Sequence, residues 1–469
     1  MREILNIGVS HRACHLATQF YNCREELLQL SPVENDAQVF LNPTIDKISK
    51  TVSYAPRALL WDAKSGNGAL GLHQYEAQGN DHFYTATTSD APKPTNSNVQ
   101  VIRTHPMIPK SQYQTALDTN SALPDLNDSN TRYWSDYAKL IYGPSNLNFL
   151  RDWYHDPENA SLPDFQNLGQ IKFSDFGVGQ DEFIEHYSAD FLEENFRWQL
   201  EKCEQLQGLN LISEIENSWG GFSSAMVSDL RDELPKATLF TWGFNQDDMI
   251  TVSRPGPFSK AKFNLLCNKI RSTVYLVQES DLFFPLWSNT EISSWRQAGE
   301  LCKLFDGVNS SFDLKDLNKS NSMNELKWSL QSEELSRNVV SGLEISDHDY
   351  SFFSRVPRLK NSKDHEFARC SISREKIPSE KDRNSNQFSA YEWKPSDTIP
   401  QEVAQETIYT SQLSITGQSR DVFRKWLEIV ERHFRYDNDR EELKDSLGTL
   451  ASAYEEGFYD DEDSGDDDL

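Results

Sequence analysis

The first 285 residues alternate between short continuous apolar runs and longer segments in which apolar residues recur every three or four positions. A continuous apolar run indicates a strand covered on both faces, and the wider spacing indicates an amphipathic helix. The pattern predicts strands at 3–9, 57–63, 209–215, 238–244 and 273–278, and helices at 10–28, 182–205 and 258–270, with a further helix that ends near 230. This alternation favours an α/β fold with a doubly wound parallel sheet.

The remainder of the chain is less regular and predicts a smaller α+β domain. Helical patterns at 293–305 and 323–333 are followed by short strands at 339–346 and 407–417, and then by amphipathic helices at 419–434 and 440–454. The predicted organisation is a first domain at 1–285 with a polar insertion at about 80–132, an α+β domain at 286–415 with a polar loop at about 361–402, C-terminal helices at 416–454, and a disordered acidic tail at 455–469.

The charge of the chain excludes some classes of partner. It has 73 acidic and 46 basic residues and a net charge of -27. So acidic a surface repels nucleic acid and anionic lipid headgroups, and we expect no direct contact with nucleic acid. The six cysteines are scattered without a CxxC pair, which indicates reduced thiols and a cytosol-facing location. No stretch reaches 18 apolar residues and the N-terminus has no apolar signal core, so we expect no transmembrane segment.

The stretch LQGLNLISEIENSWGGFSSAM, residues 206–226, predicts a buried strand, a turn and the start of a helix. In α/β proteins such a turn holds phosphate on backbone N–H groups. Gly220 and Gly221 leave room and Ser218 offers a hydroxyl, whereas Glu216 adds negative charge and Trp219 a large ring. Two like charges ~4 Å apart cost about 1 kcal/mol in water and several times more in a partly buried loop. We therefore expect a turn that keeps its shape but has lost most of its grip on phosphate.

Six segments carry a resemblance to known proteins. Three resemble tubulin: MREILNI at 1–7, APRALLWD at 55–62 and LQGLNL at 206–211. Three resemble, more narrowly, the misato family of the tubulin superfamily, in particular its fungal mitochondrial DNA inheritance group: YWSDYAKLIYGP at 133–144, EKCEQLQG at 201–208 and GGFSS at 220–224. The polar insertion before Trp134 also fits the misato family, because tubulins have no equivalent of it.

The resemblance implies a tubulin-like fold and a role in partitioning mitochondria and inheriting mitochondrial DNA. It implies a location at the mitochondrion, peripheral on the cytosolic face, and in the cytoplasm. It further implies protein partners at the mitochondrial surface. Composition and spacing do not by themselves indicate the mitochondrial role or the association with mitochondria.

Tubulins hold GTP with several loops, and the resemblance places these loops in this chain. In the loop after the first strand Ser10 and Ala13 are small, but Cys14 and His15 replace the Gln and Asn that read the nucleotide. Arg12 offers a partner for a phosphate. The competing interpretation of this segment is an ordinary helical turn with a surface His and Arg.

The loop after the second strand and the glycine turn at 220–221 also differ from those of tubulin. Asp62 is kept at the end of the second strand, but Lys64 replaces the acidic residue that tubulin carries near magnesium. Magnesium takes oxygen ligands, and an ammonium group in that position opposes it. The resemblance thus predicts a degenerate nucleotide site made of Ser10, Arg12, Asp62, Ser218, Gly220 and Gly221.

No catalytic residue is predicted. Residues 312–321 contain acids of the type found in the activating loop of tubulin, but the segment does not align with that loop. His11, Cys14 and His15 have a helical spacing that can hold a metal ion, yet no fourth ligand is near them in the sequence, so no metal site is predicted. We expect a non-catalytic, tubulin-like organising protein without a cofactor. The alternatives are a divergent, self-assembling GTPase that binds GTP, and an assembly factor for cytoskeletal subunits.

Overall fold

The computed structural model covers the greater part of the chain. It describes residues 2–29, 35–45, 48, 50–70, 108–157, 164–166, 171–246, 259–289, 292–316, 320–331, 337–346, 348–355, 365–374 and 386–455. The predicted acidic tail lies outside the described residues apart from Glu455, as do residues 80–107 of the predicted polar insertion.

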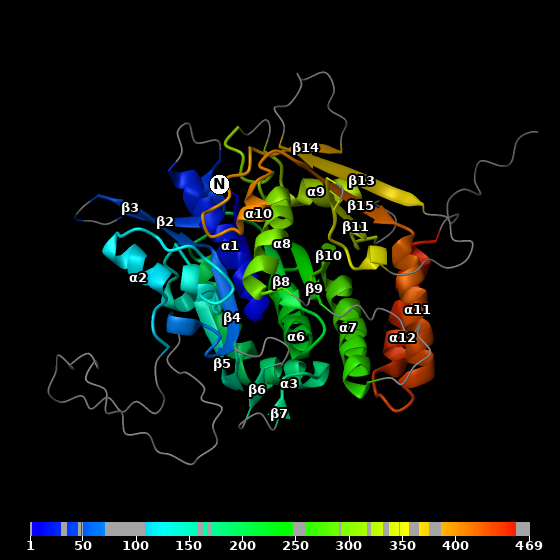
Figure 1. Cartoon of the computed structure of the whole chain (residues 1–469). Coiled ribbons are helices and arrows are strands. Elements are labelled where there is room, and N and C mark those ends of the chain that lie inside the picture. Colours follow the sequence, from blue (N-terminus) through cyan, green and yellow to red (C-terminus); the bar gives the residue numbers. More distant parts are fainter. Residues whose placement is uncertain are drawn as a thin grey trace, which may run out of the picture.

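An eight-stranded sheet forms the centre of the molecule, in the order β10-β9-β8-β1-β4-β5-β6-β7 (Figure 1). Its strands are β1 (Glu3–Val9), β4 (Ala58–Lys64), β5 (Leu147–Tyr154), β6 (Phe165–Gln166), β7 (Ile171–Lys172), β8 (Leu206–Glu214), β9 (Thr238–Asn245) and β10 (Leu282–Trp287). From β10 to β5 all neighbours are parallel, and β6 and β7 extend one edge in antiparallel fashion. Every residue of β1 is buried, because it has a strand on each side and helices on both faces, and this explains its continuous apolar run.

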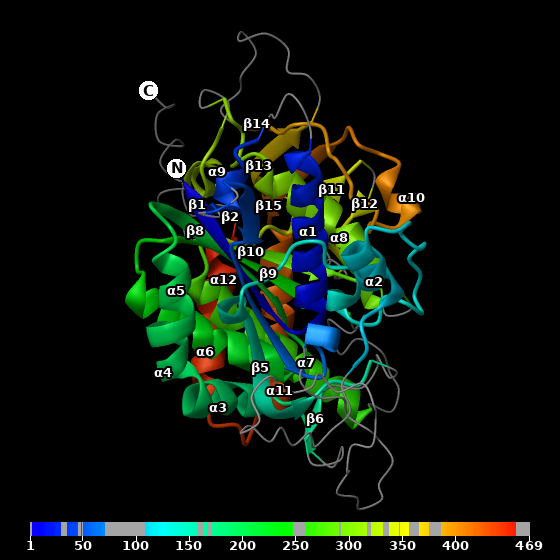
Figure 2. The same cartoon turned by 90° about the vertical axis from the view of Figure 1, so that its left-hand side faces the viewer.

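Helices cover both faces of this sheet (Figures 1 and 2). The long helices are α1 (His11–Leu28), α3 (Phe176–His186), α6 (Ser218–Glu233), α7 (Lys260–Glu279) and α8 (Ser294–Asn309). On one face α1 and α8 pack together through the rings of Phe20 and Phe305. On the other face Phe222 of α6 contacts Trp61 of β4. The doubly wound parallel sheet predicted from the sequence is therefore present.

Shorter elements connect these layers. They are η1 (Ala37–Val39), β2 (Leu41–Ile45), β3 (Val52–Pro56), η2 (Gly68–Leu70), α2 (Gln112–Thr119), η3 (Trp134–Tyr137), η4 (Pro144–Asn146), α4 (Ser188–Asp190), a π-helix (Phe191–Phe196) and α5 (Arg197–Leu200). The strands β2 and β3 form a separate antiparallel pair that extends from the body (Figure 1).

A second, smaller sheet has the order β12-β11-β15-β13-β14. The elements of this part are α9 (Met323–Leu330), β11 (Gly342–Ile345), β12 (His348–Asp349), η6 (Phe353–Arg355), β13 (Glu366–Ser373), β14 (Gln387–Ser389), α10 (Gln401–Ala404) and β15 (Thr410–Thr416). Isolated bridges join it to β10, one between Phe283 and Val339 and one between Leu286 and Ser351. This α+β part follows the first sheet in the chain, as the sequence predicts.

Two antiparallel helices, α11 (Gln418–His433) and α12 (Arg440–Ala453), pack beside α7 (Figure 1). Arg271 of α7 forms ion pairs of 2.6 Å with both Asp437 and Asp439 in the loop between the two helices. Among the helices that the structure describes, none combines the length and the apolar character needed to cross a bilayer.

Two predicted elements are wrong. Residues 273–278 are the last part of α7 and not a strand, and the apolar run arises because this helix is buried on more than one side. The predicted helix at 182–205 is broken, because Tyr187 leaves the helical region at φ -131° and α4, a π-helix and α5 follow in sequence.

Two polar segments also contain structure that was not predicted. The insertion at 80–132 includes α2, and the loop at 361–402 includes β13, β14 and α10. Half-exposed residues dominate β13, so its sequence lacks the apolar run that marks a buried strand.

Candidate functional site at the carboxyl edge of the sheet

Strands β8, β1 and β4 are neighbours in the sheet and end at its carboxyl edge. The chain leaves β1 into α1 on one face and leaves β8 into α6 on the opposite face. The direction of winding thus changes between these strands, and such a point is where doubly wound sheets usually bind ligands. The six residues of the predicted degenerate site lie on the segments that form this edge, or in the first turn of α6.

Arg12 in the first turn of α1 is held by two carboxylates. Its Nη2 lies 2.6 Å from Oε2 of Glu214 and 3.0 Å from Oε1 of Glu216. Burial opposes the charged form, yet the two carboxylates raise the pKa of the Arg12 guanidinium above its ordinary value. Burial also favours the neutral form of Glu214, and Arg12 nevertheless holds the pKa of that carboxyl below its ordinary value. The charge of Arg12 is therefore neutralised inside the protein.

The carboxylate of Asp62 is fully buried and has three donors. Its Oδ2 lies 2.8 Å from Nδ1 of His11 and accepts a 3.1 Å hydrogen bond from the indole of Trp134, while its Oδ1 accepts one of 2.8 Å from the N–H of Ala63. A side chain at Gly66 would overlap this carboxylate, so the turn after β4 requires glycine there. Asp62 is thus part of a packed polar core.

His11 and His15 are buried, which corrects the interpretation of this segment as a turn with a surface His and Arg. Nε2 of His15 lies 3.1 Å from Nε2 of His11, and Nδ1 of His15 lies 2.7 Å from the hydroxyl of Tyr137. Burial lowers the pKa of His15 well below its ordinary value, and the neighbouring His11 and His155 lower it further. His15 is therefore neutral, and the chain Tyr137–His15–His11–Asp62 is continuously hydrogen bonded.

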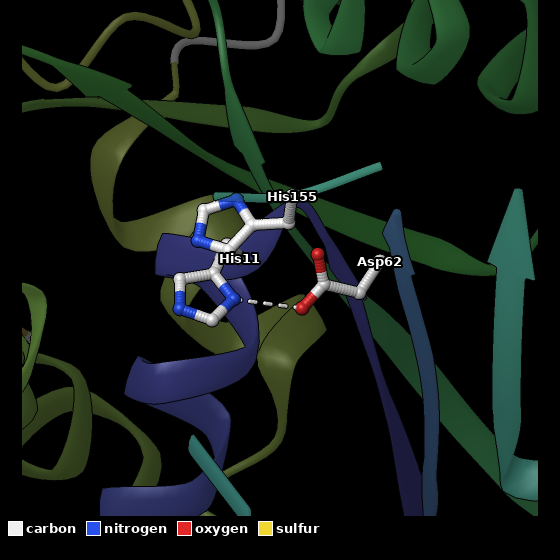
Figure 3. Close-up of side chains that lie close together, drawn as sticks. All are labelled: His11, Asp62 and His155. Atoms are coloured by element: carbon white, nitrogen blue, oxygen red, sulfur yellow. Dashed lines mark hydrogen bonds and ion pairs between the residues drawn. The ribbon is translucent and has the colours of Figure 1, made fainter. Parts of the chain in front are cut away.

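His155 follows directly after β5 and lies over the same edge. Its ring stacks on that of His11 with 3.8 Å between the centroids, as Figure 3 shows. Its Nδ1 lies 2.8 Å from Oδ1 of Asp164, whose Oδ2 accepts a 2.7 Å hydrogen bond from the indole of Trp219. Burial lowers the pKa of His155, but Asp164 and the other nearby carboxylates outweigh burial and raise it above its ordinary value.

The three predicted residues in the first turn of α6 are used for packing. The hydroxyl of Ser218 donates to the carbonyl oxygen of Asp175 at 2.6 Å and accepts from the Asp175 N–H at 2.9 Å. A Cβ at Gly220 would overlap the hydroxyl of Ser272 in α7, and one at Gly221 would overlap the carbonyl oxygen of Phe176 in α3. The glycines therefore allow three helices to approach each other closely.

Ser10 connects β1 to α1 with a φ of 123°, a value that favours glycine. Its hydroxyl caps α1 by accepting a 3.2 Å hydrogen bond from the N–H of Ala13. A hydrogen bond from the same side chain helps to lower the pKa of Glu214. Ser10 thus supports the Arg12–Glu214 pair as well as the start of the helix.

These contacts do not fit a guanine nucleotide. Arg12 and Ser218 are engaged within the protein, and both glycines are in contact with neighbouring helices. The side chain of Asn217 caps α6 by accepting from the N–H of Trp219 at 3.0 Å, so this backbone donor is also occupied. Glu214 and Glu216 place carboxylates where a triphosphate would add further negative charge.

Asp313, the first acidic residue of the segment 312–321, is not exposed at the surface. Asp313 is buried, and its Oδ2 lies 3.0 Å from Nη1 of Arg24 in α1. This carboxyl group is therefore paired inside the protein and is not offered to a second molecule.

Sequence reasoning missed five residues of this site. They are Trp134, Tyr137, His155, Asp164 and Glu214. A carboxylate near the end of a predicted strand, such as Glu214 in the strand predicted at 209–215, is a signal that the sequence offers. His155 follows a strand whose alternating exposure was not recognised, so its position could not be foreseen.

Two comparisons with known proteins agree with this geometry. Residues 2–119 match the family model of the Misato Segment II tubulin-like domain, and residues 123–329 match that of the tubulin domain. The chain is 49% identical to Protein DML1 of Kluyveromyces lactis over 99% of both chains, and 41% identical to Protein DML1 of Eremothecium gossypii over 100% of both. It is 31% identical to Protein DML1 of Debaryomyces hansenii over 98% of both chains. With its tubulin-like sheet and its full-length similarity to these proteins, the chain belongs to the misato family.

Proposed function

We propose that this protein acts in partitioning mitochondria and in inheriting mitochondrial DNA, as a tubulin-like organiser that does not hydrolyse GTP. It works through protein partners on the cytosolic face of the mitochondrion and is otherwise cytoplasmic. Membership of the misato family supports the biological role, since the sequence resembles the fungal mitochondrial DNA inheritance group. The tubulin-like sheet serves as a scaffold to which partner proteins bind, and the former nucleotide site no longer binds GTP.

The pairing of Arg12 with Glu214 and Glu216 carries the non-catalytic part of the proposal. A bound phosphate would have to displace two carboxylates from a buried guanidinium. The Coulomb energy of one such close pair is about 4 kcal/mol at the effective dielectric constant near a protein surface. A displaced carboxylate would also stay buried beside the phosphate and repel it.

Two measurements in the same fungal host test the two parts of the proposal. The protein is depleted in a fungal host, and mitochondrial DNA is counted in daughter cells by fluorescence microscopy. The same protein is captured from undepleted cells, and its nucleotide content is measured by chromatography after acid extraction. We expect daughter cells to lose mitochondrial DNA on depletion and the captured protein to contain no stoichiometric guanine nucleotide.

The two readouts separate the alternatives. Normal mitochondrial DNA in depleted cells would contradict the biological role. One GTP or GDP per chain, retained in a magnesium-dependent manner, would contradict the non-catalytic role and support a divergent GTPase. Depletion that first reduces assembled tubulin and leaves mitochondrial DNA unchanged would support an assembly factor.

A further inference from the structure

His11, Asp62 and His155 converge from the first turn of α1, the end of β4 and the residue after β5 (Figure 3). Each offers one ligand atom, a ring nitrogen or a carboxylate oxygen, and the three atoms lie within 4.8 Å of one another. Ligand atoms at ~2.0 Å from one tetrahedral zinc ion are roughly 3.3 Å apart, so shifts of about 1 Å would bring these three atoms to three of its four positions and leave the fourth to water.

The outer hydrogen bonds of both imidazoles suit them to bind a metal ion. Nε2 of His11 lies 3.2 Å from the carbonyl oxygen of Arg132, which can accept a proton from Nε2 when Nδ1 binds a metal ion. Nδ1 of His155 donates toward Asp164 at 2.8 Å, so Nε2 is the nitrogen that can release a proton and bind a metal ion. Carbonyl and carboxylate partners of this kind fix the tautomer and raise the basicity of metal-bound histidines.

The local charge also favours a cation. Arg12 is shared between Glu214 and Glu216, whereas in the described part of the chain Asp62 pairs with His11 and Asp164 pairs with His155. These two carboxylates, each 2.8 Å from a ring nitrogen, give the cluster a negative potential. A metal ion held there would replace this potential with direct bonds.

We propose that His11, Asp62 and His155 bind one zinc ion. Two nitrogen donors and one oxygen donor suit zinc, whereas magnesium takes oxygen ligands. Zinc takes the place of the proton that Nδ1 of His11 donates to Asp62, and that proton moves to Nε2 of the same ring, where the carbonyl oxygen of Arg132 accepts it. The ring of His155, now stacked on that of His11, turns so that Nε2 points at the ion. The site is independent of the proposed mitochondrial role and needs no nucleotide.

The test measures zinc binding to the full-length chain, purified without a histidine tag. Samples are dialysed against buffered micromolar zinc, and zinc per chain is determined by mass spectrometry. The variants are H155Q and H11Q, and the matched control is H186Q, which removes an exposed histidine of α3. We expect one zinc per chain in the wild type and in H186Q. We expect a loss of affinity of at least about 100-fold in H155Q and H11Q, because losing a ligand costs more than losing an outer hydrogen bond.

A second measurement covers variants that fold poorly. Zinc should raise the melting temperature of the wild type and of H186Q, because an ion that binds only the folded chain stabilises it. It should leave that of H155Q unchanged. Wild type that retains no zinc, or H155Q that binds zinc as tightly as the wild type, would overturn the proposal.

Discussion

At the scale of single residues, the glycines of α6 are required by the packing of helices and not by a ligand. A Cβ at Gly221 would overlap the backbone of Phe176 in α3, and a carbonyl oxygen cannot turn away as a side chain can. We predict that Gly221→Ala lowers the free energy of unfolding by about 3 kcal/mol, the upper part of the usual range for overpacking. Urea unfolding followed by tryptophan fluorescence measures this loss.

Gly448 in α12 is the matched control. A Cβ there would meet nothing within 4 Å, so Gly448→Ala should raise the free energy of unfolding by about 0.5–1 kcal/mol through helix propensity. Equal losses in the two variants would mean that helix context, and not the α3–α6 contact, decides the outcome at Gly221.

The sequence revealed the types of residue at the site but not their partners. Charge at Glu216 and bulk at Trp219 were recognised as unfavourable for phosphate. That Glu214 and Glu216 hold Arg12 depends on β1 and β8 being neighbours, which pairs Val9 with Ser213 at the end of the two strands. Strand order is a property of the folded sheet, and a single sequence does not determine it.

At the scale of elements, the sequence predicted β1 and α1 closely. A strand buried on both faces has a continuous apolar run, and the observed bounds of α1 agree with the helix predicted at 10–28 although most of its residues are buried. The end of α7 was mistaken for a strand because Val274, Leu276 and Val277 are all buried. Helix α2 was not predicted because it lies in the polar segment before Trp134. Ser111 caps this helix through its side chain, and a serine at that position is a sequence signal for a helix start.

We predict that the free energy of unfolding depends on pH through Asp136 in the short helix η3. Its residues Trp134 and Tyr137 bond to Asp62 and His15, and its Asp136 accepts a 2.9 Å hydrogen bond from the N–H of Tyr133. Burial raises the pKa of Asp136 to about 6, above its ordinary 3.8. Between these values the folded chain binds more protons than the unfolded chain, so this contribution to stability is complete below about pH 4 and is lost as pH rises through 6.

Asp136→Asn isolates that contribution, because the amide keeps an acceptor for Tyr133 and does not titrate. We expect the wild type to lose stability relative to this variant between pH 4 and pH 7, measured by urea unfolding at each pH. If the wild type kept or gained stability relative to Asp136→Asn as the pH rises, burial would not raise the pKa of Asp136 and the prediction would be wrong.

At the scale of the whole molecule, a buried cluster of four charges joins the two sheets. Arg24 of α1 contacts Asp306 of α8 and Asp313 at 3.0 Å each, and Arg374 after β13 contacts Asp306 at 2.6 Å. All four side chains are almost completely inaccessible to solvent. The first sheet and the α+β part are thus linked by charges that neither part could leave buried alone, and such a link makes their unfolding mutually dependent.

Arg24→Met should therefore destabilise the whole molecule, because it removes the cation that lies 3.0 Å from both Asp306 and Asp313. Burial already raises the pKa of Asp313 to about 7, so this carboxyl can take up a proton, and we expect a loss of about 3 kcal/mol, the lower end of the usual cost of removing one partner of a buried pair. The control is Arg432→Met, which removes an exposed ion pair with Glu428 and should cost less than about 1 kcal/mol. Urea unfolding read by fluorescence and by circular dichroism should show both probes moving together in each protein. A small effect of Arg24→Met, or a loss seen by only one probe, would contradict this. It would show that apolar packing holds the two sheets together and that the buried ion pairs add little to the free energy of unfolding.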